Sequence, residues 1–256
     1  MRSTLIYSPE VRVYPDAVAV AEAAAEVFAR AATRAVAENG RFYVALAGGS
    51  TPKAVYQLLA DDEASGRRKL PWTGIEVFFG DERCVPPDHA ESNFRMAHET
   101  LLARVPIPAA NIHRIRGEMD PQAAAAAYEV ELKRVVPSHH AMLPRLDLVL
   151  LGMGQDGHTA SLFPGTPGLQ ETSHSVVANP GPEPASWRVT LTLPALSAAS
   201  NVLFLVIGAE KAPMLRRVLQ TDAAGASYPA QRVRPTAGWL RWFLDEAAAS
   251  QLNART

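Results

Sequence analysis

Apolar residues follow two spacings along this chain, one typical of helices and one typical of buried strands. Near the amino terminus they recur every three or four positions, at Val20, Ala24, Val27 and Ala31. This spacing predicts a helix over residues 15–38 that Gly40 ends. Short apolar runs predict strands over residues 41–47, 75–79, 146–151, 188–193, 202–207 and 238–244. The last of these segments is rich in aromatic residues and is also compatible with a helix.

Polar residues that cap helices precede most of the remaining segments. Proline, which is favoured in the first helical turn, follows two of them. The predicted caps are Thr51, Ser92 and Asp120, with helices over 52–59, 93–104 and from Pro121 onward, and a further turn and helix over 208–219. Because strands and helices alternate throughout, the sequence predicts an α/β protein whose parallel sheet is covered by helices on both faces.

The chain shows no sign of a boundary between domains. Its length of 256 residues fits one large domain, and we find no internal repeat. Residues 164–186 are rich in proline, glycine and serine, but we interpret them as a long active-site loop rather than a linker. We therefore predict a single domain over residues 1–256.

Composition and charge exclude several classes of function. Hydrophobic residues make up 48% of the chain and charged residues 20%, as in a globular protein with a sizeable core. The 25 basic and 26 acidic residues give a net charge of −1, so neither nucleic acid nor an acidic membrane is expected as a partner. The single cysteine, Cys84, precludes an internal disulfide and fits a reducing compartment. Since no long apolar segment is present, we expect a cytoplasmic location.

The most informative stretch is GMGQDGHTASLFP, at residues 152–164. It follows the apolar run at 146–151, and open α/β sheets bind ligands at the carboxyl ends of such strands. Asp156 and His158 lie two residues apart here, and an imidazole beside a carboxylate suits proton transfer near neutral pH. We predict that His158 is a general base that Asp156 orients. The other histidines lie in predicted helices or polar loops without partners and give no metal-site pattern: His89, His98, His113, His139, His140 and His174.

The same turn formally matches the dinucleotide fingerprint, with glycines at 152, 154 and 157. Asp156, however, would place a carboxylate against the pyrophosphate, and Pro164 would interrupt the helix that must follow. No strand ending in an acid follows about 20 residues later. A nicotinamide cofactor is therefore not expected.

Two further turns carry groups suited to an anion. GGSTP, at residues 48–52, joins a predicted strand to a predicted helix, and its N–H groups and hydroxyls suit a phosphate monoester. An ordinary capped turn explains this run equally well. The triplet at 81–83 closes the next strand, where Arg83 could bind phosphate or simply belong to a solvated charge cluster. Nothing near Cys84 in sequence activates it as a nucleophile.

Six segments occur in an order shared by one family of enzymes: ALAGGSTP (45–52), FFGDERCVP (78–86), ESNFRM (91–96), LGMGQDGHTASLFP (151–164), WRVTLTLPAL (187–196) and FLVIGAEKA (204–212). They resemble 6-phosphogluconolactonases, and the resemblance covers nearly the whole chain. It implies a three-layer, Rossmann-like α/β fold with a mostly parallel sheet. It also implies hydrolysis of 6-phosphogluconolactone to 6-phosphogluconate, in the oxidative pentose phosphate pathway.

The resemblance indicates how such a reaction would proceed. His158 would take a proton from the attacking water and return it to the leaving ring oxygen. Backbone N–H groups of the turn at 152–157, or an arginine, would hold the oxyanion. Because the lactone is already electrophilic, no metal or organic cofactor is expected. The remote phosphate and the sugar of this small-molecule partner would be held by Gly49, Ser50, Thr51, Asp81, Arg83, Gly157, Arg188 and Lys211.

Two other functions are compatible with parts of this pattern. Glucosamine-6-phosphate deaminases resemble this chain, but their loop reads DGHIAFNEP, and Phe163 replaces the glutamate before the proline. Asp81 is shared with those deaminases and does not discriminate. A non-catalytic sugar-phosphate sensor would tend to lose the proton-transfer pair. The sequence leaves open whether the protein is a monomer or a homodimer, and whether Glu82 and Asn93 touch the substrate.

Overall fold

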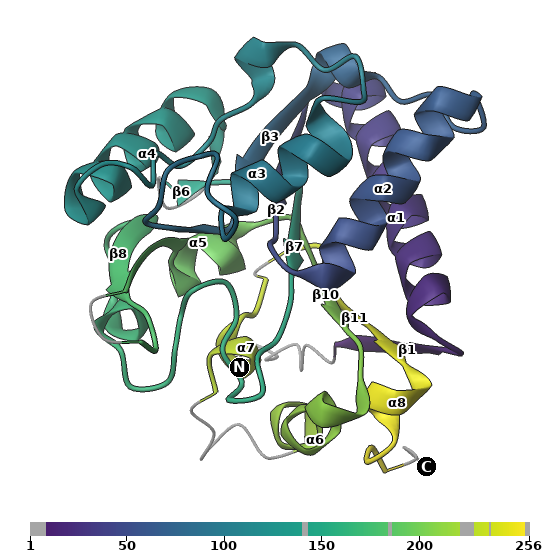
Figure 1. Ribbon diagram of the computed structural model, residues 1–256, viewed down its shortest axis with the longest axis vertical. Coiled ribbons are helices and arrows are strands. Elements are labelled where there is room, and N and C mark those ends of the chain that lie inside the picture. Colours follow the sequence, from purple (N-terminus) through teal and green to yellow (C-terminus); the bar gives the residue numbers. More distant parts are fainter. Residues whose placement is uncertain (1–8, 140–142, 184–185, 221–227, 236, 254–256) are drawn as a thin grey trace, which may run out of the picture.

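The centre of the molecule is a six-stranded sheet whose neighbouring strands run parallel (Figure 1). A computed structural model describes residues 9–139, 143–183, 186–220, 228–235 and 237–253. The predicted α/β class with a parallel sheet is confirmed. The strands, in order across the sheet, are β1 (Glu10–Tyr14), β11 (Trp239–Asp245), β10 (Asn201–Val206), β7 (Leu148–Leu151), β2 (Phe42–Leu46) and β3 (Ile75–Phe79).

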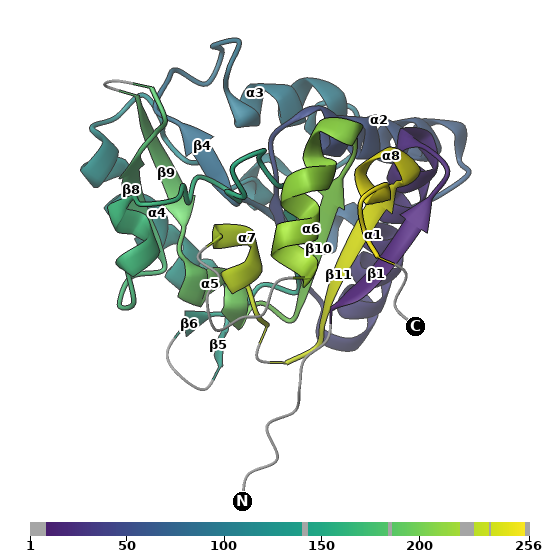
Figure 2. The ribbon, with the colours of Figure 1, turned by 90° about the horizontal axis from the view of Figure 1, so that it is seen from below.

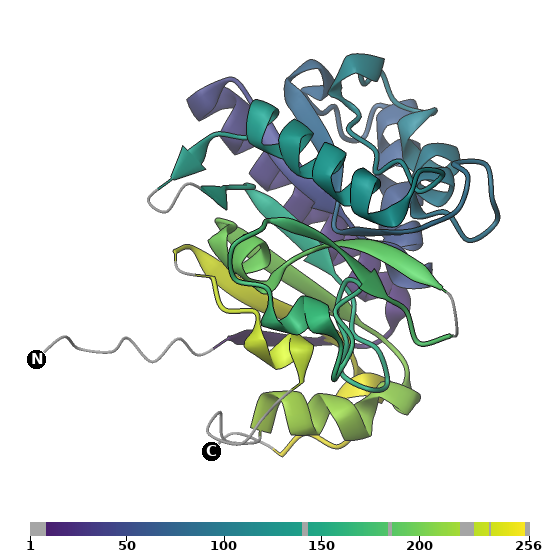
Figure 3. The same ribbon diagram turned by 90° about the vertical axis from the view of Figure 1, so that its left-hand side faces the viewer.

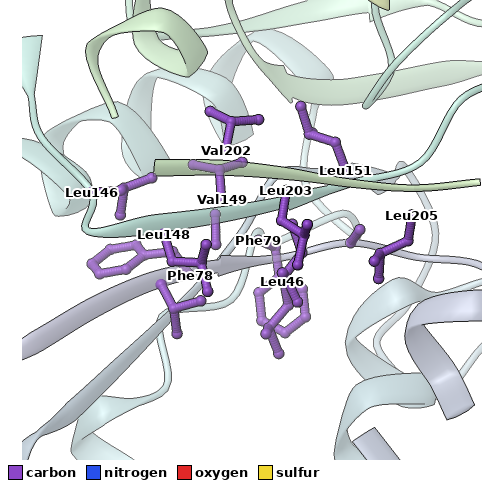
Figure 4. Close-up of a cluster of buried hydrophobic side chains, with 14 of the residues drawn as sticks. Leu46, Phe78, Phe79, Leu146, Leu148, Val149, Leu151, Val202, Leu203 and Leu205 are labelled. Atoms are coloured by element: carbon purple, nitrogen blue, oxygen red, sulfur yellow. The ribbon is translucent and has the colours of Figure 1, made fainter. Parts of the chain in front are cut away.

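The central strands are apolar runs because both faces of this part of the sheet are covered. Every residue of β3 and β7 is buried. Figure 1 shows two helices on one side of the central strands, α1 (Ala17–Asn39) and α2 (Ser50–Ser65), and two on the other, α4 (Pro121–Val135) and α5 (Leu193–Ala198). Figure 4 shows the core they enclose, where side chains from neighbouring strands pack together, among them Leu46, Phe79, Val149 and Leu203.

A second sheet, antiparallel and three-stranded, lies beside the first (Figure 2). It consists of β4 (Asp81–Arg83), β9 (Trp187–Leu191) and β8 (Val176–Pro180). The strand predicted over 188–193 belongs to this sheet and not to the parallel one. The segment 164–186, interpreted as a loop, contains β8 and a 3₁₀ turn at Pro167–Gln170. Pairing with β9 fixes β8, and local composition cannot reveal such pairing.

The predicted helix caps at Ser92 and Asp120 are confirmed, and Asp16 caps α1 in the same way. Each side chain accepts the N–H three residues further on, at 2.9–3.1 Å. Gly40 ends α1 with φ of 76°. In the part of the chain that the structure describes, every helix is too short or too polar to span a bilayer. The remaining helices are α3 (Asn93–Ala97), α6 (Ala212–Gln220), α7 (Pro229–Arg232) and α8 (Glu246–Ala249), and Figure 3 shows α4 and α6 at opposite ends of the molecule.

Several boundaries and short elements differ from the prediction. α2 begins at Ser50, one residue before the predicted cap Thr51, and it continues to Ser65, whereas the predicted helix ends at residue 59. α3 gives way to a π-helical turn at His98–Leu102. The prediction missed β1, α5, α7, α8 and the hairpin of β5 (Ser138–His139) and β6 (Leu143–Pro144), because these elements are short and, unlike the buried strand β3, carry no long apolar run.

The histidines outside the predicted site are not all without partners, contrary to expectation. His113 is buried, with Nε2 2.9 Å from Glu76 on β3 and Nδ1 2.8 Å from Glu131 on α4. His174 lies 2.9 Å from another glutamate of α4. His140 lies outside the described residues. These carboxylates are distant in sequence from the imidazoles, so local patterns could not reveal the pairs.

The contacts of Glu131 predict an acid-sensitive contribution to stability. The hydrogen bond from Arg134 lowers the pKa of Glu131 to about 2, against partial burial and with help from His113. A carboxyl group with a depressed folded-state pKa stabilises the fold above its unfolded value near 4.5 and loses this effect as the pH falls to about 2. We expect Glu131→Gln to unfold about 1 kcal/mol more easily near neutral pH, allowing for solvent screening. Urea unfolding should show this difference vanish near pH 2; a difference that persists there would contradict the assignment.

Candidate active site

A cavity of about 530 Å³ opens where β2, β3, β7 and β10 end. The loops that follow these strands form it, as expected for an open α/β sheet. Seven of the predicted site residues line it: Gly49, Ser50, Thr51, Asp81, Arg83, His158 and Lys211. Among the described residues, Asp156, Gly157 and Arg188 are not part of the lining but adjoin residues that are.

His158 and Asp156 form a close pair at this cavity. Nδ1 of His158 lies 2.6 Å from Oδ1 of Asp156, which also accepts the main-chain N–H of His158 at 3.1 Å. Burial would raise the pKa of Asp156, but this N–H and the charge of His158 outweigh burial and lower that pKa below its ordinary value. Asp156 is therefore a carboxylate at neutral pH. With a proton on Nδ1 directed to it, Nε2 of His158 carries the lone pair that accepts a proton.

Two glycines shape the turn that holds this pair. A Cβ on Gly154 would lie 2.1 Å from Nδ1 of His158 and 2.6 Å from Oδ1 of Asp156, so only glycine leaves room for both groups. Gly157 has φ of 81°, and a Cβ there would lie 2.9 Å from the ring of Tyr228. The structure thus gives Gly157 a role in the shape of the turn. Its predicted contact with the substrate stays a prediction.

Internal hydrogen bonds already use part of the oxyanion-binding capacity predicted for this turn. The N–H of Gly154 donates to the carbonyl of His158 at 2.9 Å, and the N–H of Gly157 donates to the carbonyl of Gly154 at 3.1 Å. The N–H of His158 is directed to Asp156. These three groups hold the turn together, which leaves an arginine or the other N–H groups of residues 152–157 as candidates for the oxyanion.

Phe163 forms an aromatic wall next to the imidazole. Its ring centroid lies 4.7 Å from that of His158, with the two planes inclined by 51°. The residue is buried. Residue 163 therefore carries no ionisable group, and among the described residues Phe163 is not part of the cavity lining.

The loop at 48–52 presents the start of a helix to the cavity. The N-cap of α2 is Gly49, whose φ of 101° few other residues adopt and which offers no side-chain acceptor. Thr51, predicted as the cap, lies instead within the first turn. Among the described residues, no side chain bonds the first N–H groups of α2 or the hydroxyls of Ser50 and Thr51, which leaves them for a ligand at the positive end of the helix dipole.

Asp81 is fixed at the cavity by two neighbours. Its Oδ2 accepts the hydroxyl of Ser161 at 2.6 Å, and its Oδ1 accepts Nδ2 of Asn93 at 3.3 Å. Asn93 itself lines the cavity, and a Cβ on Gly48 would lie 2.0 Å from its Oδ1. Asn93 therefore joins the loops that follow β2 and β3 and is open to a ligand, a placement the sequence left undecided.

Two residues beside Asp81 serve the structure instead. Glu82 accepts the N–H groups of Asn93 and Phe94 at 2.8 Å and the hydroxyl of Ser92 at 3.0 Å, so it orders the start of α3. Burial raises the pKa of Glu82, although these bonds oppose the rise. Among the described residues, Glu82 is absent from the cavity lining. Burial also raises the pKa of the Cys84 thiol to about 11, which agrees with its interpretation as a plain thiol.

Arg83 and Arg188 lie directly opposite each other across the β4–β9 pair. Like charges in this arrangement destabilise a sheet unless an anion lies between them. Arg83 lines the cavity and donates to the carbonyl of Glu91. Arg188 is half-buried and donates to the carbonyl of Trp187 at 3.1 Å. The pair favours an anion at this edge of the cavity.

Lys211 adds a second cation to the cavity lining, from a segment far from Arg83 in the sequence. It ends the 3₁₀ turn Ala209–Lys211 that follows β10, and its N–H donates to the carbonyl of Gly208 at 3.1 Å. Arg83 follows β3 and belongs to the antiparallel sheet. The two cations therefore converge only because the fold brings these loops together.

Comparisons with known proteins show which family this chain belongs to. The family model described as Glucosamine-6-phosphate isomerases/6-phosphogluconolactonase matches residues 15–242. The chain is also 42% identical over 244 residues to the 6-phosphogluconolactonase of Nostoc sp., an alignment that covers 95% of this chain and 98% of the relative. This protein belongs to the glucosamine-6-phosphate isomerase/6-phosphogluconolactonase family.

Solved structures of the family and its fold relatives match most of the chain. The 6-phosphogluconolactonase from Trypanosoma brucei has a TM-score of 0.84 and 31% identity, covering 96% of this chain and all of that one. A monomeric glucosamine-6-phosphate deaminase has a TM-score of 0.80 at 19% identity, covering 94% and 99%. The latter shares the fold alone.

In this member of the family, two buried tyrosines that sequence reasoning missed hold the strand ends beneath the site. The hydroxyl of Tyr56 bonds both the N–H and the carbonyl of Ala47 at 2.9 Å, just after β2. The hydroxyl of Tyr128 bonds the N–H and carbonyl of Phe79 at 2.7 and 3.0 Å, at the end of β3. An aromatic residue on the apolar face of a helix usually indicates core alone, so no local signal marks this second role.

Proposed function

We propose that this protein is a 6-phosphogluconolactonase, which hydrolyses the ester of 6-phosphogluconolactone to give 6-phosphogluconate. The observation that carries the proposal is the pair of His158 and Asp156 at the cavity that Arg83, Lys211 and the start of α2 also line. Such a site suits a substrate whose phosphate lies several bonds from its reacting carbonyl, because anchoring the phosphate orients the carbonyl. The names of the relatives from Nostoc sp. and Trypanosoma brucei support the same reaction.

His158 accepts a proton at Nε2 from a water molecule whose oxygen attacks the lactone carbonyl carbon. Asp156 stabilises the imidazolium that forms. The tetrahedral intermediate then collapses, the bond from the carbonyl carbon to the ring oxygen breaks, and His158 returns its proton to that oxygen. The new carboxylic acid loses its own proton to solvent at neutral pH. Every step uses water and side chains of the chain itself.

Arg83 and Lys211 bind the phosphate in this proposal, so their loss should weaken substrate binding. We expect Arg83→Ala or Lys211→Ala to raise the KM for 6-phosphogluconolactone about tenfold to 100-fold, the effect of losing one charged hydrogen bond. The kcat should change much less, because the base remains. Steady-state kinetics measure both constants, and Arg188→Ala belongs in the same series.

A matched control for these variants is Arg134→Ala on the outer surface of α4, where the guanidinium pairs with Glu131. It removes the same charge and should leave KM unchanged. If Arg83→Ala, Lys211→Ala and Arg188→Ala all leave KM unchanged as well, the phosphate sits elsewhere.

Two other functions make different predictions for one pair of assays. Freshly generated 6-phosphogluconolactone with a pH indicator, corrected for spontaneous hydrolysis, reports lactonase activity. Ammonia release from glucosamine 6-phosphate reports a deaminase, and binding without either reaction reports a sensor. The ring of Phe163 against His158 favours the lactonase, because it replaces a second carboxylate with a group that carries no proton. Activity in the second assay alone would refute the proposal.

We also propose that the enzyme is a single domain over residues 1–256 that acts in the cytoplasm on a small phosphorylated sugar lactone. The net charge of −1 and the single cysteine support this setting.

A further inference from the structure

Asp245 lies at the end of β11 and takes no part in the mechanism above. The residue is buried, with 8% of its surface exposed, and it lines the same cavity as His158. Its Oδ1 accepts the N–H of Ala248 at 2.7 Å and so caps the short helix α8. A helix cap uses only this one contact, and the carboxylate makes others.

The same carboxylate holds the turn that carries Lys211. The N–H of Gly208 lies 3.1 Å from each of the two carboxylate oxygens of Asp245. The carbonyl of Gly208 in turn accepts the N–H of Lys211 at 3.1 Å, which closes the turn. Gly208 is thus the link between the carboxylate and the lysine.

The backbone of this turn depends on glycine at position 208. Gly208 has φ of 97°, and a Cβ there would lie 2.3 Å from Oε2 of Glu210. Figure 2 shows α6, which follows Lys211, beside α8, which follows Asp245, and the two helices are in contact. A shift of Asp245 would therefore pass to the base of Lys211 directly.

We infer that Asp245 is a positioning residue for phosphate binding, which fixes the Gly208 turn so that Lys211 meets the phosphate of the substrate. The inference rests on the proposed function, since it takes the phosphorylated lactone as substrate. Asp245 acts through its acceptor oxygens and not through its charge, because a negative charge at this cavity repels a phosphate dianion.

Kinetics with two lactones test this role. We expect Asp245→Ala to raise the KM for 6-phosphogluconolactone about tenfold while kcat stays within about twofold. Turnover of glucono-δ-lactone, which carries no phosphate, should stay unchanged. Asp245→Asn should restore the KM to within about threefold, because its amide oxygen accepts the same N–H groups. Asp120→Ala is the matched control: it removes the cap of α4, outside the cavity lining, and should leave both substrates unaffected.

A double-mutant cycle tests whether Asp245 acts through Lys211. In a Lys211→Ala background, Asp245→Ala should add nothing further to the KM, because the group that it positions is gone. If the two effects on KM multiply instead, Asp245 acts independently of Lys211 and the inference is wrong.

If Asp245→Ala fails to fold, Asp245→Ser takes its place in both experiments. Serine caps helices as well as aspartate does, so α8 should keep its cap. The hydroxyl oxygen of serine lies one bond nearer the main chain than a carboxylate oxygen of aspartate, and it is therefore farther from the N–H of Gly208. An unchanged KM in the folded variant, an equal loss on both lactones, or an asparagine variant as impaired as the alanine variant would each overturn the inference. A wild-type protein that lacks lactonase activity would instead refute the proposed function, and the inference with it.

Discussion

Replacing His158 with asparagine should lower the kcat for 6-phosphogluconolactone by about two to four orders of magnitude. Asparagine preserves a hydrogen-bonding group of similar reach beside Asp156, but it has no nitrogen basic enough to accept a proton from water. The phosphate anchors are untouched, so KM should remain within about threefold. Stopped indicator assays give kcat, and binding of 6-phosphogluconate by calorimetry tests whether the cavity is intact.

The matched control is His174→Asn. His174 is also an imidazole next to a carboxylate, 2.9 Å from Glu129, but it lies outside the cavity lining. The same substitution there should leave kcat unchanged. Near-normal turnover by His158→Asn would remove the imidazole from the mechanism, and an equal loss in both variants would indicate a general effect of losing such a pair.

Replacing Gly154 with alanine should lower kcat about tenfold to 100-fold without removing any reacting group. The new Cβ would lie 2.1 Å from Nδ1 of His158 and 2.6 Å from Oδ1 of Asp156, far inside van der Waals contact. The pair must separate or rotate, and a base displaced by about 1 Å can lose this much rate. Kinetics at saturating substrate measure the loss.

Gly152→Ala is the control for this experiment. It lies in the same turn, but a Cβ there meets no atom within 4 Å. We expect it to keep most of the kcat lost in Gly154→Ala; because Gly152 lines the cavity, its new methyl group should raise KM instead. Comparable losses in the two variants would mean that the turn tolerates no side chain for reasons of backbone shape, and not because of the imidazole–carboxylate pair.

Local sequence was informative wherever an element is long or fully buried. The predicted strand at 75–79 matches β3, and the helix predicted over 15–38 matches α1 to within two residues. Buried strands of a parallel sheet are continuous apolar runs, and long helices repeat their pattern several times. β8 was missed for the opposite reason. It is half-exposed, lies in a segment rich in proline and glycine, and exists because β9 pairs with it.

Most of the site residues that the sequence predicted line one cavity, but the sequence did not show how they are arranged. Asp156 and His158 are neighbours in one turn, so their spacing alone predicted a proton-transfer pair, and the structure places them 2.6 Å apart. Asn93 and Asp245 give no such signal. They become part of the cavity only because strands far apart in sequence end at the same edge of the sheet.

The chain by itself therefore determined the fold class and the family and suggested the reacting groups, because each depends on short-range patterns of apolar residues, glycines and caps. Tertiary structure alone decided which cations share a cavity with the imidazole. It also decided that Glu82 accepts hydrogen bonds at the start of α3 and so holds that helix beside the site. It also decided that Arg188 faces Arg83 across a sheet. The physical reason is that hydrogen bonds and close packing between distant segments set these distances, and no local spacing encodes them.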